Sequence, residues 1–248
     1  KFEDLIFDNN TAGNGCAALM DTSVVPDISG FTIRNHQSGN YVFCIFFNTI
    51  QTSFDLRTCI FESNAHNSQG STIDGGGSGI WIANKKEIAQ QRSLQLYFTE
   101  CQFRDNLSPH TGGAFAIGQS DTVKATDLLI DTCTFTSNTA QSIGGALWIA
   151  TRSNIEIRNS AFRNNNAVQT AGSIVIASTA PSCVINKCTF NRENANNLAN
   201  AIYINSLTTE TFLTENTFTD CGYSSDSNEV VAINSNYFEY VENTITFT

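Results

Sequence analysis

Apolar residues recur along this chain in pairs, with one residue between the two members of each pair. A period of two places both side chains on the same face of an extended strand. The chain therefore predicts many short strands, each with one buried face. Pairs of this kind are Leu96/Phe98, Phe115/Ile117, Leu128/Ile130, Leu147/Ile149, Ile155/Ile157, Ile174/Ile176, Cys183/Ile185 and Ile202/Ile204.

These pairs belong to a unit that recurs about every 28 residues. Its clearest copy, residues 132–150, reads TCTFTSNTAQSIGGALWIA, in which Cys-x-Phe-x-x-Asn precedes Gly-Gly-Ala. Self-similarity at this period is typical of solenoids. Ile33 fills the second anchor slot, and the anchoring aromatic residues are Phe7, Phe61, Phe103, Phe135, Phe162, Phe190, Phe218 and Phe247.

The repeat predicts an all-β fold, a right-handed parallel β-helix of about nine coils with three short strands in each coil. We expect the right hand because crossovers between parallel strands are almost always right-handed. The period runs from end to end, so residues 1–248 are expected to form a single domain. An insertion loop near residues 84–93 interrupts one coil.

Equivalent residues of stacked coils should form columns, because neighbouring coils lie about 4.8 Å apart. The anchoring Phe residues are expected to stack in the interior. The Gly pairs Gly112/Gly113 and Gly144/Gly145, which become Ala171-Gly172 and Ala199-Asn200 in later coils, predict a bend with positive φ or a close backbone approach. An asparagine three residues after the anchor predicts a hydrogen-bonded ladder at one turn. The ladder residues are Asn64, Asn106, Asn138 and Asn165.

The chain has eight cysteines, and four of them lie two residues before an anchoring Phe. This position faces the interior, so the four are expected to form a column of buried thiols or of disulfides between coils. Disulfides would fit an oxidising compartment. There is no CxxC pair and no His/Cys metal spacing, so we expect no metal and no cofactor. The column residues are Cys59, Cys101, Cys133 and Cys188, and the further disulfide candidates are Cys16, Cys44, Cys183 and Cys221.

Charge and composition narrow the classes of partner. The formal net charge is −10 and no basic patch is present, so nucleic acid is not an expected partner. No apolar run is long enough to cross a bilayer, so we expect no membrane insertion. The chain begins at Lys1 without a signal-peptide pattern, which suggests a mature or excised chain. Sequons at Asn9 and Asn106 are glycosylation candidates and favour an extracellular or cell-surface location.

Carboxylates need separate attention, because pectin-type lyases and glycosidases also use a β-helix. A glycosidase requires two carboxyl groups at a defined separation. The candidates here fall in turns and do not recur in one column, so we expect no catalytic residues. A polysaccharide lyase or glycosidase is the alternative from the enzyme class. The candidates are Asp121, Asp127, Asp131, Asp220 and Asp226, and His36, His66 and His110 are also expected in turns.

One outward-facing column is apolar or aromatic. A continuous apolar stripe on a surface usually marks a contact. Either the insertion near residues 84–93 covers this column, or the column meets a partner or a second copy. Its interface candidates are Trp81, Trp148, Val175, Tyr203 and Val231, with Ala116 between the two tryptophans.

The repeated segments FESN, FRDN with GGAF, FTSN with GGAL, and FRNN with AGSI resemble the repeats of chlamydial-type polymorphic outer-membrane proteins, which are autotransporter passengers. The resemblance covers residues 61–204. It implies an extracellular right-handed β-helix with adhesive or structural work and without enzymatic activity. The cysteine column departs from that pattern and fits a strongly oxidising setting better.

Both ends of the chain read as parts of coils, KFEDLIF and NTITFT. An uncapped coil exposes a strand edge and an open core. We expect these ends, including Phe7 and Phe247, to meet another copy head to tail, and such a contact builds a filament if it does not close. The expected function is that of a non-catalytic extracellular structural or surface protein. An adhesin that binds glycans or cell-surface ligands is the alternative.

Overall fold

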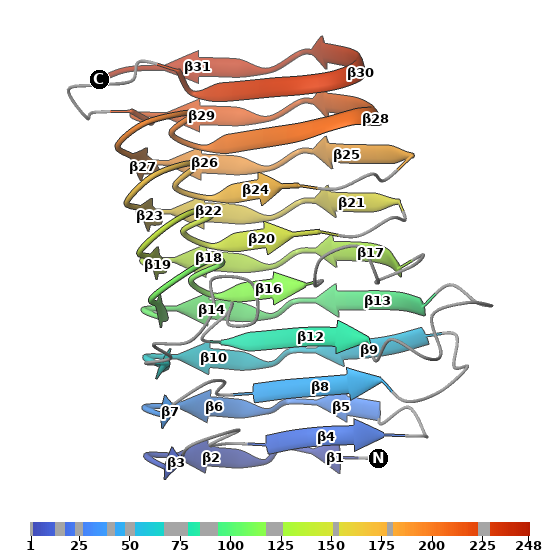
Figure 1. Ribbon diagram of the computed structural model, residues 1–248, viewed down its shortest axis with the longest axis vertical. Coiled ribbons are helices and arrows are strands. Elements are labelled where there is room, and N and C mark those ends of the chain that lie inside the picture. The colour runs from blue at the N-terminus through green and yellow to red at the C-terminus, as the bar shows by residue number, and fades with distance from the viewer. Residues whose placement is uncertain are drawn as a thin grey trace.

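A computed structural model describes residues 2–12, 18–22, 27–38, 43–47, 53–66, 79–84, 94–117, 126–150, 154–177, 181–222 and 229–248. The regular structure in these ranges is β-strand throughout, and the strands pair in parallel with their equivalents one coil away. Figure 1 shows the coils stacked from the N-terminal to the C-terminal end. The predicted all-β parallel β-helix is therefore confirmed. The expected insertion at residues 85–93 lies outside the described residues.

A nine-stranded sheet carries the anchoring residues, with one strand from each successive coil. Its strands are β2 (Ile6–Asp8), β6 (Thr32–Arg34), β10 (Ile60–Glu62), β14 (Gln102–Arg104), β18 (Thr134–Thr136), β22 (Ala161–Arg163), β26 (Thr189–Asn191), β29 (Thr217–Thr219) and β31 (Thr244–Thr246).

A seven-stranded sheet follows the next turn and adds a fourth strand to the three that the apolar pairs predict for each coil. The pairs do not reveal it because each of its strands has only two residues. Its strands are β3 (Thr11–Ala12), β7 (Gln37–Ser38), β11 (Ala65–His66), β15 (Leu107–Ser108), β19 (Thr139–Ala140), β23 (Asn166–Ala167) and β27 (Asn194–Ala195).

The largest sheet has two arms, which the long strands β28 (Ile202–Thr214) and β30 (Val231–Val241) connect in the last coils. The first arm contains β1 (Phe2–Glu3), β5 (Asp27–Ser29), β9 (Ser53–Arg57), β13 (Leu94–Thr99), β17 (Thr126–Asp131), β21 (Ile155–Arg158) and β25 (Ser182–Asn186). The second arm contains β4 (Ala18–Thr22), β8 (Phe43–Phe47), β12 (Ile80–Asn84), β16 (Phe115–Ile117), β20 (Leu147–Ile149) and β24 (Ile174–Ile176).

The interior is filled by the apolar pairs of both arms and by a column of phenylalanine rings. Six rings lie parallel to one another, with centroids 4.8–4.9 Å apart. This separation equals the spacing between strands, so each ring packs on the equivalent ring of the next coil. The predicted stack is confirmed for Phe61, Phe103, Phe135, Phe162, Phe190 and Phe218.

The last coil differs in register from the sequence prediction. Phe218 pairs with Ile245, so Phe247 does not hold an anchor slot. Val231 pairs with Ile202 and therefore belongs to an inward column, not to the outward one. Both errors have one cause, because the unit changes length by one or two residues here and a strict period of 28 misplaces the slots.

The bend before each second-arm strand uses its two positions differently, as the Gly pairs predict. The first position has positive φ, as in Gly144 (+66°) and in Ala171 (52°). The second position lies close to neighbouring backbone, because a Cβ on Gly145 would lie 2.1 Å from the carbonyl oxygen of Gly172. A side chain at Gly145 would therefore force neighbouring coils apart.

The asparagine ladder is also confirmed, and its pattern is regular. Asn106 Nδ2 donates to Asn138 Oδ1 at 2.9 Å and to the Phe61 carbonyl at 3.0 Å. Asn138 Nδ2 donates in the same way to Asn165 Oδ1 and to the Phe103 carbonyl, each at 3.0 Å. The side chains are fully buried, so the ladder satisfies polar groups that water does not reach.

Candidate functional site

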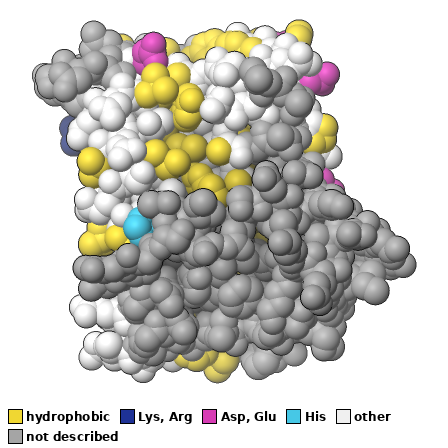
Figure 2. All heavy atoms as spheres, viewed as in Figure 1, with side chains coloured by type: hydrophobic (Ala, Val, Ile, Leu, Met, Phe, Trp, Pro, Cys, Tyr) yellow, Lys and Arg dark blue, Asp and Glu magenta, His cyan; other side chains and the backbone are white. Residues whose placement is uncertain are grey.

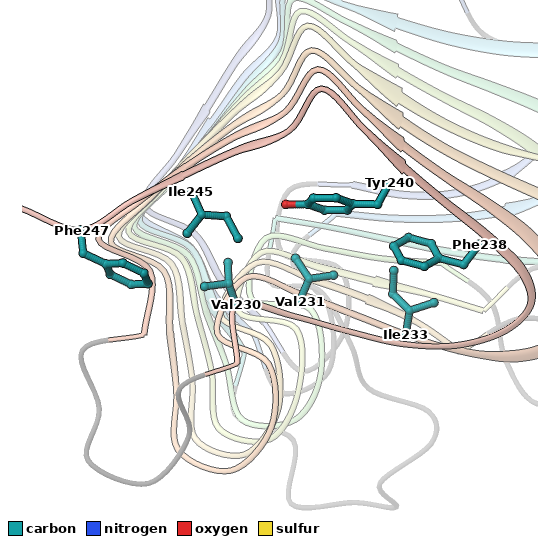
Figure 3. A pocket seen from close by; sticks show the side chains of 7 residues that line it. All are labelled: Val230, Val231, Ile233, Phe238, Tyr240, Ile245 and Phe247. Carbon is teal, nitrogen blue, oxygen red and sulfur yellow. The ribbon is translucent and has the colours of Figure 1, made fainter.

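The C-terminal end of the helix presents an open apolar layer, which we call the C-terminal layer. Its side chains line a cavity of about 430 Å³. Figure 3 shows them pointing from several sides into the space that the last coil encloses. The layer consists of Val230, Val231, Ile233, Phe238, Tyr240, Ile245 and Phe247.

These side chains occupy positions that are buried in every complete coil. Tyr240 pairs with Leu213 and Ile245 with Phe218, and both partners are fully buried. Ile245 is nevertheless 47% exposed and Phe247 64% exposed. The exposure arises because no described coil lies above this layer, so an interior cross-section meets solvent there.

The N-terminal end carries a smaller exposed apolar group. Leu5 is 40% exposed and Ile6 is 67% exposed. Phe7 is partly buried, and its ring centroid lies 5.8 Å from that of Phe31. Phe7 occupies the same column as Ile245, because both are connected through the nine-stranded sheet.

The outward column of the second arm is real but less exposed than the pattern suggests. The register aligns Trp81, Ala116, Trp148, Val175 and Tyr203. Ala116 and Val175 are buried, whereas Trp148 and Tyr203 are partly exposed. Figure 2 shows apolar side chains gathered on the face formed by β20, β24 and β28. The side chain of Trp81 lies outside the described residues.

Two residues that the sequence pattern places elsewhere extend the ladder at its ends. His36, expected in a turn, is fully buried, and its main-chain N–H donates to Asn64 Oδ1 at 3.2 Å. Its Nδ1 accepts a hydrogen bond from the Asn10 main chain, so Nε2 carries the proton that faces the Phe7 carbonyl at 3.1 Å. Glu193 occupies the opposite end and is 1% exposed. Both stand three residues after an anchor, which is the signal that could have identified them.

Glu193 is a buried acid with an unusual environment. Its Oε2 accepts hydrogen bonds from the Asn165 main chain at 3.2 Å and from the Ser173 hydroxyl. Its Oε1 is buried and has no hydrogen-bond partner among the described residues. Burial raises the pKa of Glu193 to about 8, and the hydrogen bonds from Ser173 and Asn165 oppose this shift.

A surface cavity of about 290 Å³ adjoins this turn and is the place to look for a pair of catalytic carboxyls. Glu193 and Asp220 both line it, and hydrogen bonds from Thr248 hold the pKa of Asp220 below its ordinary range. Opposite shifts of this kind characterise acid–base pairs. However, Glu193 directs its carboxyl into the interior, where Oε2 is bonded and Oε1 is sealed from solvent. A substrate in the cavity would not reach it.

The other carboxylate candidates do not form a second pair. Asp131 accepts hydrogen bonds from Asn159 and Thr132 and pairs with Arg158 at 3.0 Å on the outer surface. The side chain of Asp127 accepts from the main chain of Asn154. Asp121 and Asp226 lie outside the described residues. Within the described ranges, no group of three or more His, Cys, Asp or Glu side chains could hold a metal ion.

The cysteine column exists as predicted, but its members are free thiols. The described free cysteines are Cys59, Cys101, Cys133, Cys183, Cys188 and Cys221, all buried. The disulfide prediction is wrong for these six, because column thiols turn toward backbone carbonyls instead of toward one another. Cys133 Sγ lies 3.4 Å from the carbonyls of Phe98 and Asp131. Cys16 and the side chain of Cys44 lie outside the described residues.

Ser160 shows why a hydroxyl can replace a thiol in this column. Its Oγ donates to the Arg158 carbonyl at 2.7 Å, which corresponds to the bond of Cys133 to Asp131. Neighbouring thiols and burial raise the pKa of Cys59 and Cys101, and burial raises that of Cys188 to about 12. The reactive thiolate is therefore rare in the folded chain.

We expect the folded chain to react with Ellman's reagent at no more than two cysteines, Cys16 and Cys44, and at all eight after unfolding in urea. Both counts can be read from the absorbance of the released thiolate without prior reduction. Fast labelling of a third cysteine in the folded chain would contradict the buried column. Fewer than eight labelled after unfolding would restore a disulfide.

The two sequons differ in accessibility. Asn106 is 1% exposed and its amide is used by the ladder, so the folded chain does not present it for glycosylation. Asn9 is exposed and remains a prediction. No helix in the described ranges is long and apolar enough to span a bilayer.

The fold defines the class of this protein, a parallel β-helix in which ring and amide columns run along one axis. A family model described as the right-handed β-helix region matches residues 78–247. The match covers more than half of the chain, so the chain belongs to this family. No curated protein and no solved structure matches the chain.

Proposed function

We propose that this β-helix is a non-catalytic extracellular structural or surface protein whose copies associate head to tail. The observation that carries the proposal is the C-terminal layer, a cross-section of core exposed to solvent. Exposed apolar surface of this extent usually marks a contact. The membership in the β-helix family fits a surface role, and the resemblance to autotransporter repeats supports an extracellular location.

A second copy is the proposed occupant because the columns at the two ends correspond. Ile245 ends the column that begins at Phe7, and Tyr240 ends the column that begins at Phe2. Ile233 ends a column that begins at Met20. A copy stacked in register would therefore continue apolar columns with apolar residues, as each coil does within the chain. The contact is heterologous and open, which is the geometry of a filament.

Charge at the same ends opposes the contact. Glu242 and Asp4 stand at equivalent corners of the last and first coils, both with positive φ, so stacking brings two carboxylates together. The chain as a whole carries a net charge of −10. Association should consequently be weak at low ionic strength and stronger at physiological salt, where the Debye length is about 8 Å.

The test is sedimentation velocity of the 248-residue chain, with electron microscopy of the heaviest fractions. We expect larger species that grow with protein concentration and with salt, and their loss in Ile245→Asp, which places a charge in the C-terminal layer. Leu107→Asp is the matched control, because Leu107 is 42% exposed on the lateral surface and Ile245 is 47% exposed at the end.

Monomers under all conditions would reject head-to-tail association of this chain and leave the layer to a further segment of a longer protein. Equal loss of association in both variants would point to lateral contacts. In that case the adhesin alternative gains weight, and the outward aromatic column at Trp148 and Tyr203 is the surface to test against glycans.

A further inference from the structure

We propose that Glu193 is a pH-sensitive lock on the C-terminal coils. As a neutral acid it completes the buried ladder, and its ionisation loosens the coils that follow it. The argument is independent of head-to-tail association, because it concerns hydrogen bonds inside one chain.

The first step is the position that each Glu193 oxygen takes over from an asparagine. In the preceding coil, Asn165 Oδ1 accepts hydrogen bonds from Asn138, and Asn165 Nδ2 donates to the Phe135 carbonyl at 3.0 Å. Glu193 Oε2 takes the accepting role toward Asn165. Oε1 is left with the donating role, and it has no partner among the described residues. Only a protonated carboxyl carries a hydrogen that could donate there.

The second step is a compensating change in the facing wall. The bend before the second-arm strand has Ala114, Ala146 and Ala201 in three coils but Ser173 in the coil that faces Glu193. Ser173 is fully buried, and its hydroxyl donates to Glu193 Oε2. The chain thus supplies a hydroxyl donor at the coil where the ladder changes from amide to carboxyl.

The third step is the set of titratable and charged groups around Glu193. Along the column, the preceding neighbour is the neutral Asn165 and the following one is the thiol of Cys221, whose pKa burial raises to about 12. The flanking turns contribute Arg192 and Asp220, which line the surface cavity with Glu193. Within the described residues, no cation is paired with the Glu193 carboxyl. A negative charge formed there would consequently be buried without compensation.

The direction of the pH effect follows from the shift. The pKa of Glu193 is raised from 4.5 to about 8 in the folded chain. Stability from the neutral acid is full below about pH 4.5 and is lost progressively as the pH rises toward about 8, where the loss levels off. Contacts in a solenoid connect only neighbouring coils, so the loosening should concentrate in residues 194–222.

The test compares urea unfolding of the wild type and of Glu193→Gln between about pH 5 and pH 9. Gln supplies a permanent N–H donor at the Oε1 position. We expect the unfolding constant of the wild type to rise relative to that of E193Q by up to about tenfold per pH unit within this window. The matched control is Glu156→Gln, because Glu156 pairs with Arg158 on the outer surface at 2.9 Å. It should follow the wild type.

Parallel pH profiles of the wild type and E193Q would overturn the proposal. If E193Q does not fold, carboxyl ¹³C NMR of the wild type with labelled glutamate decides the question. One glutamate titrating near pH 8 supports the lock. Titration of every glutamate near its ordinary value would reject it.

Discussion

Replacing Phe135 with alanine is expected to lower the free energy of unfolding by about 3–5 kcal/mol. The ring is 1% exposed and stacks on both sides, 4.9 Å from Phe103 and 4.8 Å from Phe162. Its removal loses the burial of a large apolar group and opens a void between two coils. The neighbouring rings are fixed by strand pairing on either side, so they cannot move in to fill the space.

Urea unfolding followed by circular dichroism measures this loss. The control is Phe247→Ala, because Phe247 is 64% exposed in the C-terminal layer and its loss should have a much smaller effect under conditions where the chain is monomeric. Equal losses in the two variants would mean that the C-terminal layer is packed as tightly as the interior, which contradicts the structure.

Replacing Asn138 with alanine should cost at least about 3 kcal/mol, although the residue is polar and lies at a turn. Its side chain accepts from Asn106 Nδ2 at 2.9 Å and donates to Asn165 Oδ1 and to the Phe103 carbonyl. The substitution leaves these groups buried without partners. Each unsatisfied group costs about 1–3 kcal/mol, which is more than the hydrogen bond itself contributes.

The same unfolding assay tests the ladder, with Asn197→Ala as the matched control because the side chain of Asn197 is exposed. We expect little change in the control. A loss below about 1 kcal/mol for N138A would show that the ladder adds no more than an ordinary surface turn. Asn138→Asp should regain stability at low pH, because a protonated carboxyl can donate where a carboxylate cannot.

The sequence predicts the parts of this fold in which one side chain repeats. The rings of Phe103 and Phe135 and the amides of Asn106 and Asn138 could be placed in columns, because identical residues return at nearly equal intervals. Ile245 was missed where the interval shortens and the residue type changes. The free thiols could not be predicted, because strand spacing permits a disulfide and only the side-chain direction of Cys133 excludes it.

The candidate site was harder to predict than the fold. Phe7 could be assigned to the N-terminal end, because a solenoid exposes its core wherever a coil has no neighbour. Glu193 could not be recognised as a buried acid, since an isolated glutamate in a turn normally points to solvent. Its burial depends on Ser173, which is 20 residues earlier in the sequence and meets it only after the coil closes.

The parallel stacking of coils also determines how the molecule would respond to tension. Hydrogen bonds between strands point along the helix axis, so a pull on the two ends acts along these bonds and not across them. Such loading separates one coil at a time, like opening a zipper. Each coil of about 28 residues would release roughly 95 Å of contour length. A rod of this kind yields in even steps and can absorb extension gradually, which suits a protein held between two attachment points.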